Sequence, residues 1–501
     1  MSRGKVSIPL DLPCPDALVA GQLGKQQAAY QALREAILAR HLAAGARLPS
    51  TRVLAERWGV SRGTLERVFE RLCSEGYVSR VGGSGTRVCA VIPDALLGTA
   101  LREDVPIAQA AEAVSVPVPG VQAGVPFVAR LPDPQVFPWA QWSRALTRGL
   151  ATASAGDLGS GDAAGLASLR EQIAAYLRSY RGIACQAQEV IITSGIRHGL
   201  DLLARTLLVP GDKVCVEDPG YPAARTLFGM AGAQVEDVPV GAQGIDQRVL
   251  DAHADARLVY VTPAHQSPLG VTLSVSRRLE LLAWAQASGA WVIEDDYDSE
   301  FNYHSAPLPA LKALDGGERV IYCGSFNKTL FVGLRVGFML VPAAVRGPLL
   351  DRLGVTARSV GITEQVGLAE YLGNGGFVRH LRQARQAYQA RRDLLLACLA
   401  EHAPGCYEVS GQHAGLHFVL WLGAGVEEEA FCQRAAQVGL IVQPLGRFCR
   451  QVHLPAGVMI GFAALSLAQV RYSGRQLARV LREMWQAGGG LHIDPEAGIQ
   501  G

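Results

Sequence analysis

The chain has no run of 18 or more consecutive apolar residues, so we expect no membrane-spanning helix. Its first residues contain no apolar core followed by a small-residue cleavage site, which argues against secretion. The 10 cysteines show neither CxxC nor CxxH spacing. That pattern favours reduced thiols and argues against a zinc site, and we expect no metal. Together these absences predict a cytoplasmic protein.

Charged residues are also scarce, at 18% of the chain, whereas 49% of the residues are apolar. This composition indicates a folded protein, and 501 residues are more than one core usually organises, so we expect two or three domains. Residues 1–90 carry 13 Lys and Arg against 7 Asp and Glu, although the whole chain has a net charge of only +2. A basic first segment favours a polyanionic partner for that segment, with ordinary scatter of charge as the alternative.

Three helical patterns and a hairpin pattern occupy the first ninety residues. Apolar spacing predicts a helix over residues 26–40. Ser50 and Ser61 are each placed to N-cap a further helix, in "TRVLAERWGV" and "RGTLERVFERLCSEG", and Gly59 separates the two. Two capped helices joined by a tight turn form a helix-turn-helix, and "YVSRVGGSGTRV" alternates as the hairpin of a wing would.

The start of the second helix carries the residue types that read DNA. In a helix-turn-helix these N-terminal residues meet base edges, and nearby cations meet phosphates. A three-helix packing module with solvated arginines is the alternative. Arg80 and Arg87 flank the glycines of the wing. The predicted DNA-binding residues are Arg52, Ser61, Arg62, Thr64, Arg67 and Gly83.

The segment "LPSTRVLAERWGVSRGTLERVFERLCSEGYVSRVGGSGTRV" resembles the winged-helix domain of the GntR regulators over its 41 residues. The resemblance implies a double-stranded DNA operator as partner. We expect this domain to span residues 20–90. Residues 91–125 are rich in Ala, Val and Pro and are expected to form a linker.

From residue 126 onward, helical patterns alternate with short apolar segments. The strand candidates are "EVIIT", "KVCVE", "RLVYV", "AWVIE" and "RVIYC". The intervals between them are long enough for crossover helices, which predicts an α/β domain with a largely parallel sheet covered on both faces. Ligands bind such sheets at the carboxyl ends of the strands, so we expect the site in the loops that follow these segments.

Four of these five loops offer a group with a chemical use. Ser194, Gly195 and Ile196 follow the first strand and open a helix, whose free N–H groups suit a phosphate. Tyr221 follows the second strand and can present a ring face, although a packed tyrosine beside a Pro-Gly turn is the plainer interpretation. Asp295 and Tyr297 follow the fourth strand, where an acid and a hydroxyl suit a ring nitrogen and a phenolate; a solvated turn is the alternative.

Lys328, in "YCGSFNKTLFVGLRVGF", follows the fifth strand and precedes another apolar run. A lysine between two buried strands is costly unless its amine has a function, and lysine amines form Schiff bases with carbonyl cofactors. With the phosphate loop, the tyrosines and the acid, the set meets the needs of pyridoxal 5'-phosphate (PLP).

The large domain resembles the fold type I aminotransferases over residues 126–485, leaving residues 486–501 as a tail. The resemblance is carried by "TSGIRHGL", "EDPGYP", "TPAHQSPLG", "VIEDDYDSEF" and "GSFNKTLFVGLRVGF". It implies that Lys328 forms a Schiff base with PLP, that Asp295 meets the pyridine nitrogen, and that Tyr297 meets the ring hydroxyl. It further implies that Tyr221 stacks on the ring. The implied phosphate ligands are Ser194, Gly195, Ile196, Ser325 and Arg335.

The pairing of the two domains is similar to the MocR subfamily of GntR regulators. That likeness implies a homodimeric transcription regulator which senses an amino compound or PLP itself through Lys328. Its aminotransferase-like domain would serve sensing rather than catalysis, with residual transamination left open. A working aminotransferase with an appended DNA-binding domain is one alternative. A repressor of the same fold that no longer binds the cofactor is another, disfavoured by the intact lysine, acid and tyrosine.

The chain departs from the aminotransferase pattern at several positions. Asn327 stands where a serine commonly precedes the lysine, Ser267 replaces an asparagine, and Val332 replaces a proline common in the subfamily. The segment "VMIGFAALS" lacks the arginine that clamps a substrate carboxylate in many aminotransferases. Arg447 and Arg225 are the candidates for binding an effector instead, and Asn327 is given no role.

Overall fold

The computed structural model describes residues 24–81, 85–92, 125–159, 162–303, 308–316, 319–356 and 360–490. The chain divides into two compact units, residues 1–113 and residues 114–501, and each is described by itself. Most of the expected linker and most of the expected tail lie outside the described residues. Within the described ranges, every helix is too short or too polar to cross a membrane.

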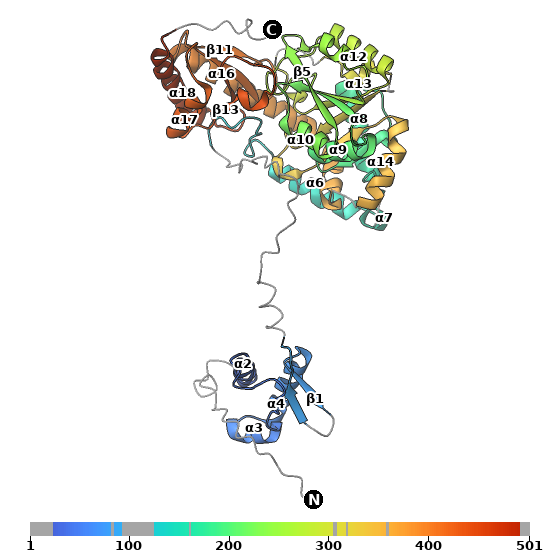
Figure 1. The fold of residues 1–501 in the computed structure, drawn as a ribbon, viewed down its shortest axis with the longest axis vertical. Coiled ribbons are helices and arrows are strands. Elements are labelled where there is room, and N and C mark those ends of the chain that lie inside the picture. Colours follow the sequence, from blue (N-terminus) through green and yellow to red (C-terminus); the bar gives the residue numbers. More distant parts are fainter. Residues whose placement is uncertain are drawn as a thin grey trace, which may run out of the picture. The chain divides into compact units, whose positions relative to one another are not determined.

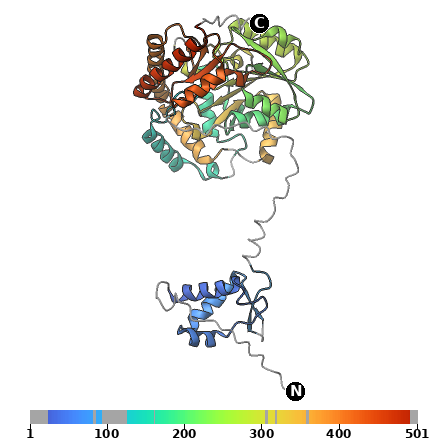
Figure 2. The same ribbon diagram turned by 60° about the vertical axis from the view of Figure 1, so that its left-hand side comes forward.

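In the part of the N-terminal unit that the structure describes, three helices pack with an antiparallel hairpin (Figures 1 and 2). Leu33, Trp58 and Phe69 belong to one buried cluster between them. The elements are α2 (Lys25–Leu38), α3 (Thr51–Trp58), α4 (Arg62–Ser74), β1 (Val78–Val81) and β2 (Gly85–Val88). The predicted winged helix-turn-helix is therefore confirmed.

The two predicted helix caps are also present. The Ser50 hydroxyl accepts a hydrogen bond from the backbone N–H of Val53 at 3.3 Å, and the Ser61 hydroxyl accepts one from Thr64 at 3.0 Å. Gly59 adopts φ 61° and ends α3, because a left-handed residue cannot continue the helix. The sequence therefore fixes the turn between α3 and α4 through local contacts alone.

An eight-stranded sheet forms the first lobe of the C-terminal unit (Figure 1). All five predicted strands are present, and β9, β8, β7 and β4 run parallel as expected. Strand β5, which was not predicted, lies parallel beside β4. In spatial order the strands are β3 (Val190–Thr193), β10 (Gly337–Leu340), β9 (Val320–Ser325), β8 (Trp291–Asp296), β7 (Leu258–Val261), β4 (Lys213–Asp218), β5 (Gln234–Gly241) and β6 (Gly244–Ile245). Strand β10 is antiparallel to both of its neighbours.

Helices cover both faces of this sheet, as buried parallel strands require. Alternate residues of β7 enter different clusters: Leu258 and Tyr260 pack in one, and Val259 and Val261 pack in another. The helices of this lobe are α6 (Trp139–Thr152), α7 (Ala155–Leu158), α8 (Ala167–Tyr176), α9 (Ile196–Leu207), α10 (Pro222–Met230), α11 (Gln247–Asp251), α12 (Val275–Ser288), α13 (Leu311–Leu314), α14 (Ala343–Thr356) and α15 (Ile362–Gly373).

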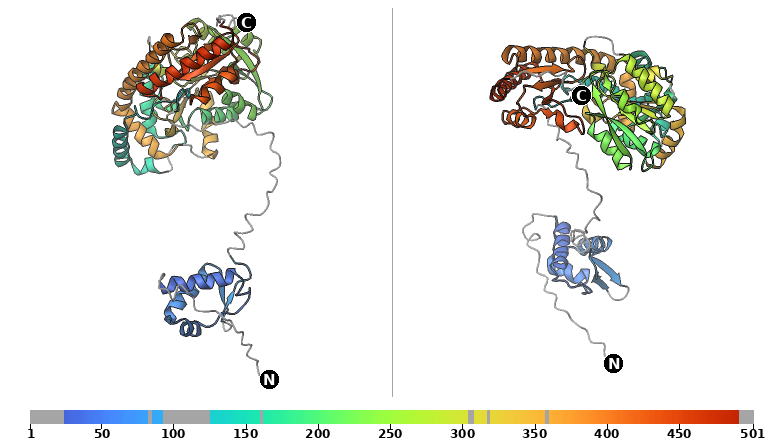
Figure 3. Two further views of the ribbon diagram at one scale, coloured as in Figure 1. Left: turned by 90° about the vertical axis from the view of Figure 1, so that its left-hand side faces the viewer. Right: turned by 45° about the horizontal axis from the view of Figure 1, so that its top comes forward.

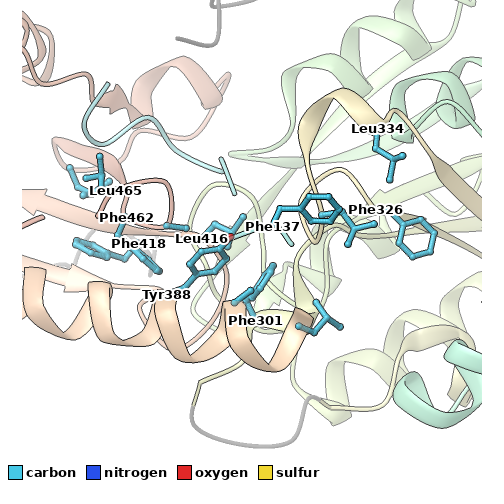
Figure 4. Packing of buried hydrophobic residues seen from close by; sticks show 14 of the residues in the cluster. Phe137, Phe301, Phe326, Leu334, Tyr388, Leu416, Phe418, Phe462 and Leu465 are labelled. Carbon is cyan, nitrogen blue, oxygen red and sulfur yellow. The ribbon is translucent and has the colours of Figure 1, made fainter. Parts of the chain in front are cut away.

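The second lobe is a four-stranded antiparallel sheet with two long helices and one shorter helix, in orange to red in Figures 1 and 3. Its elements are α16 (Gly376–His402), β11 (Tyr407–Ser410), β12 (His417–Leu422), α17 (Glu428–Gln437), β13 (Gln443–Pro444), β14 (Gly457–Gly461) and α18 (Leu467–Ala487). One apolar core spans both lobes: Phe301 of the first contacts Tyr388 on α16, and Phe418 stacks on Phe462 (Figure 4). The short helical turns are η1 (Leu177–Arg181), η2 (Ala187–Glu189), η3 (Ser299–Phe301), η4 (Val332–Leu334) and η5 (Leu445–Phe448).

Candidate functional site

Strand β10 lies between β3 and β9 and brings together the two loops that follow them. Most of the predicted phosphate ligands lie in these loops. The first residue of β10, Gly337, pairs with Thr193 at the end of β3 and with Ser325 at the end of β9. A Cβ atom on Gly337 would lie 2.8 Å from the Cα of Gly195, closer than atoms can approach. Glycine at this position therefore lets the loop after β3 close on the loop after β9.

The loop that contains Ser194, Gly195 and Ile196 opens helix α9, with Gly195 as its N-cap at φ 104°. The Ser325 hydroxyl lies in the facing loop and accepts a hydrogen bond from the Asn327 N–H at 3.2 Å. Arg335 is exposed, adopts φ 54°, and lies two residues before the start of β10. Within the described residues Arg335 forms no ion pair, so its cation is available to an anion at this edge of the sheet.

Asn327, for which the sequence suggested no role, lies against this cradle. A Cβ on Gly195 would be 3.2 Å from the side-chain nitrogen of Asn327. The side-chain oxygen of Asn327 is buried and has no hydrogen-bond partner among the described residues. Its amide is thus a polar group turned toward the predicted phosphate loop.

Lys328 follows β9 in a tight turn, and its Nζ donates a hydrogen bond to the backbone carbonyl of Arg130 at 2.7 Å. Burial and, to a smaller extent, the nearby Arg130 charge lower the pKa of the Lys328 amine, against the opposing effect of Asp298, to about 8. The neutral amine is the nucleophilic form, so this environment prepares Lys328 to bind a carbonyl carbon.

This pKa gives a pH prediction for covalent capture of PLP. Neutral amine is present above the pKa, so the capture rate should rise with pH and level off above about 8. Between pH 8.5 and 9.5 we expect a rise of about 1.3-fold, against about tenfold for a lysine with an ordinary pKa. Stopped-flow absorbance of cofactor-free protein mixed with PLP measures it. A continued tenfold rise would show that the environment does not activate this lysine.

Asp295, on β8, is buried, and its carboxylate accepts a hydrogen bond from the Tyr260 hydroxyl at 2.6 Å. Burial, with the help of the Asp296 and Asp298 charges and against the hydrogen bond from Tyr260, raises the pKa of Asp295 to about 7. Among the described residues no Lys or Arg forms an ion pair with it. A buried carboxyl without a cationic partner fits a protonated ring nitrogen, which would supply the missing positive charge.

Tyr297 follows β8 and belongs to a buried network that links the two lobes. Its hydroxyl lies 3.2 Å from Nδ1 of His265, and the same nitrogen lies 3.2 Å from the Asp298 carboxylate. The other ring nitrogen of His265 lies 3.4 Å from the Gly411 carbonyl in the second lobe. Burial lowers the pKa of His265, but the Asp298 charge outweighs it and the net shift is upward.

The sequence did not single out His265, Asp298 or their neighbour His417 on β12. The first two lie inside quoted motifs, "HQSPLG" and "DDYDSEF", yet their pairing depends on loops 33 residues apart. The rings of His265 and His417 are 5.1 Å apart, and these two histidines and Asp298 bring three potential metal-ligand atoms within 4.8 Å. Hydrogen bonds to Asp298, Gly411 and Pro268 account for their placement without an ion.

Tyr221 is the N-cap of α10, and its hydroxyl accepts a hydrogen bond from Arg197 at 3.0 Å. The two predicted effector arginines lie in one small pocket with it. Arg225 pairs with Asp237, and Arg447 lies 3.5 Å from Glu429. Both arginines therefore already have carboxylate partners.

The predicted DNA-binding residues group on the N-terminal unit. Arg52, Arg62 and Arg67 are exposed on α3 and α4. Arg62 pairs with Glu66 at 2.9 Å, and the Ser61 and Thr64 hydroxyls are 2.7 Å apart at the start of α4. Beside the wing, Arg80 lies 4.0 Å from Glu70, whereas Gly83 lies outside the described residues.

Both units match known families. Residues 132–473 match the family of aminotransferases of class I and II, and residues 25–88 match the bacterial regulatory proteins of the gntR family. The fold and site thus define a winged-helix regulator fused to an aminotransferase-type domain of the PLP-dependent class. The chain belongs to the MocR subfamily of GntR regulators, because regulators that are 33% and 34% identical to it match 93% and 84% of its length.

Two such relatives are regulators by name. The probable rhizopine catabolism regulatory protein MocR of Rhizobium meliloti is 33% identical over 475 residues, covering 93% of this chain and 95% of that protein. The pyridoxine biosynthesis regulator PdxR of Corynebacterium glutamicum is 34% identical over 426 residues, covering 84% and 88%. Among solved structures, kynurenine aminotransferase of Pyrococcus horikoshii, in complex with PMP, has a TM-score of 0.66 at 28% identity and covers 72% of this chain and 92% of its own.

Proposed function

We propose that this protein is a PLP-dependent transcription regulator that senses an amino compound, or PLP itself, through Lys328. When bound, PLP supplies an aldehyde that combines reversibly with primary amines. The observation that carries the proposal is the presence, on one chain, of an exposed basic helix-turn-helix and a half-buried lysine of lowered pKa that feels the charge of the buried Asp295. We place the DNA-binding domain at residues 20–90 and the sensing domain at residues 126–485, and the protein would act in the cytoplasm with its operator.

Each residue of the sensing site has one proposed task. Lys328 binds the cofactor's carbonyl carbon, Asp295 holds the ring nitrogen protonated, and Tyr297 hydrogen-bonds the ring hydroxyl. Tyr221 covers a ring face at the end of β4. The proposed phosphate ligands, supported by the closure of the β3 and β9 loops around Gly337, are Ser194, Gly195, Ile196, Ser325 and Arg335.

Binding of a ligand would act on DNA through the two lobes of the C-terminal unit. An amino compound that competes with Lys328 for PLP changes the contacts between the lobes and so their relative position. It shifts the equilibrium only by its different affinity for the two arrangements. We propose a homodimer, because fold type I sites are built at subunit interfaces and helix-turn-helix operators are often paired half-sites; sedimentation velocity measures it.

The test of this function is a titration of the yellow, PLP-loaded protein with a panel of amines and amino acids. Absorbance and binding to operator DNA are read in the same samples. A compound that changes both signals at the same concentration supports the proposal. If every compound that changes the absorbance leaves DNA affinity unaltered, the two units are uncoupled and the proposal is wrong.

We propose that Arg52, Ser61, Arg62, Thr64, Arg67 and Gly83 form the DNA-reading surface, and Arg62→Ala tests it. If Arg62 meets a base edge, this change should weaken specific binding by about 5- to 150-fold at fixed salt, since one such contact is worth ~1–3 kcal/mol. Arg434→Ala is the matched control, because Arg434 is an ion-paired surface arginine of the other unit. Gel-shift titrations with operator and scrambled DNA measure both variants. If both variants lose the same affinity for operator DNA, α4 is not the helix that reads the bases.

A PLP-dependent aminotransferase with an appended DNA-binding domain is the second candidate function. The intact lysine and acid, and the similarity to an aminotransferase of known structure, favour it. Single-turnover conversion of bound PLP by amino acids, followed by turnover with keto acids, separates the two candidates. Turnover at tens per second would make the chain an enzyme.

A further inference from the structure

Arg130, which the sequence did not single out, has a strained backbone inside the site. Its φ is 62°, a left-handed conformation that side chains with a Cβ disfavour. The strain is retained at the point where the Arg130 carbonyl accepts the hydrogen bond from Lys328 at 2.7 Å. Non-glycine residues held in this region concentrate at ligand sites, where the surrounding structure fixes them.

The Arg130 guanidinium points to the loop after β7. Its Nη1 donates a hydrogen bond to the Ser267 hydroxyl at 2.9 Å, and its central carbon lies 5.5 Å from the centre of the Phe448 ring. A guanidinium has five N–H donors, and the structure gives partners for few of them here. Arg130 is half-buried, and within the described residues no carboxylate forms an ion pair with it.

The two acids of this site, Asp298 and Asp295, already have other hydrogen-bond partners. Asp298 faces His265 at 3.2 Å, and Asp295 accepts the Tyr260 hydroxyl. Their charges act on the same site but leave the guanidinium of Arg130 without a salt bridge. A half-buried cation in this state is a binding group for an anion.

Arg130 is far from the phosphate cradle in the order of the sheet. Ser267 follows β7, which is two strands from β9 and four strands from β3. Neighbouring strands lie about 4.8 Å apart, so the loop that holds Ser267 is on the order of 10 Å from the end of β9 and 19 Å from the end of β3. The guanidinium therefore lies on the side of Lys328 away from the phosphate.

We propose that Arg130 binds the carboxylate of the sensed compound, which makes the effector an amino acid rather than a plain amine. This inference rests on the proposed function. A guanidinium binds a carboxylate through two parallel hydrogen bonds, and "VMIGFAALS" offers no arginine for that task. Arg225 and Arg447 are less available, since Asp237 and Glu429 already face them.

Two PLP-derived probes that differ only in one carboxylate test the inference. N-(5'-phosphopyridoxyl)-L-alanine and N-(5'-phosphopyridoxyl)ethylamine are titrated calorimetrically into cofactor-free, full-length protein. We expect the wild type to bind the alanine probe about ten- to hundredfold more tightly, since a bidentate charged pair is strong. In Arg130→Gln the ratio should fall to about one while affinity for the ethylamine probe is kept. Arg434→Gln, at an ion-paired surface arginine of the second lobe, is the matched control and should keep the full ratio.

Two further variants separate recognition from folding. Arg130→Lys should keep part of the ratio, because a single ammonium still attracts the carboxylate. Arg130→Gly relieves the left-handed strain, so its melting temperature should equal or exceed that of the wild type while the ratio is lost. A ratio that survives in Arg130→Gln, or an equal loss of affinity for both probes, would overturn the inference. If the wild type binds both probes equally, only this inference is wrong. If the wild type binds neither probe, the proposed function is wrong as well.

Discussion

Replacement of Lys328 by alanine is expected to abolish the Schiff-base absorption band of PLP bound to this protein. That band depends on a covalent bond between the cofactor and the lysine amine, and the variant has no amine at that position, so PLP that it holds should show only the shorter-wavelength band of the free aldehyde. Asp295, Tyr297 and the phosphate cradle remain, so the variant should still hold PLP without a covalent bond. Absorbance of the variant after gel filtration with PLP, together with borohydride labelling, checks the result.

Lys312→Ala is the control for Lys328→Ala, because the two lysines are alike in their surroundings. The Nζ of Lys312 is also buried and donates to a backbone carbonyl, that of Val320, at 2.8 Å, and burial lowers its pKa as it does for Lys328. The control should lower the stability of the fold, since it removes a buried hydrogen bond to the backbone of β9, yet keep the absorption. An Lys328→Ala variant that stays yellow and is labelled by borohydride would assign the covalent bond to another lysine.

Many residues of this site could be predicted from the sequence, because they lie at or just after the carboxyl ends of strands. A buried parallel strand is a short apolar run, and its carboxyl end is marked where polar residues begin, so Ser194, Asp295 and Lys328 could each be placed from local sequence. The helix caps Ser50 and Ser61 were also predictable, because each bonds an N–H three residues away.

The unpredicted parts depend on contacts between distant segments. The left-handed conformation of Arg130 and its approach to Lys328, 198 residues further on, leave no periodic signal. The partnership of His265 with the second lobe is equally remote. Strand β10 was visible as an apolar run after Lys328, but its antiparallel insertion between β3 and β9 is a matter of topology.

That insertion makes Gly337 a sensitive position, and Gly337→Ala is expected to damage both the fold and cofactor binding. The added Cβ would lie 2.8 Å from the Gly195 Cα, 3.0 Å from the Gly324 carbonyl oxygen and 3.0 Å from the Thr193 hydroxyl. Two of these three atoms belong to the backbone, so the neighbours cannot move away by changing a rotamer. Overpacking of this kind costs about 1–3 kcal/mol of unfolding free energy.

The loss of PLP affinity in Gly337→Ala should exceed what the loss of stability explains, because relief of the clash moves the β3 loop away from the β9 loop. Phosphate donors on both loops then no longer converge on one anion. Gly333→Ala is the control: it lies on the same connection, and its added Cβ would meet no atom closer than 3.9 Å. Chemical denaturation and PLP titration of both variants measure the two effects. Unchanged PLP affinity in Gly337→Ala would mean that the phosphate is held by one loop alone, and Ser325 or the α9 N-terminus would then lose its proposed role.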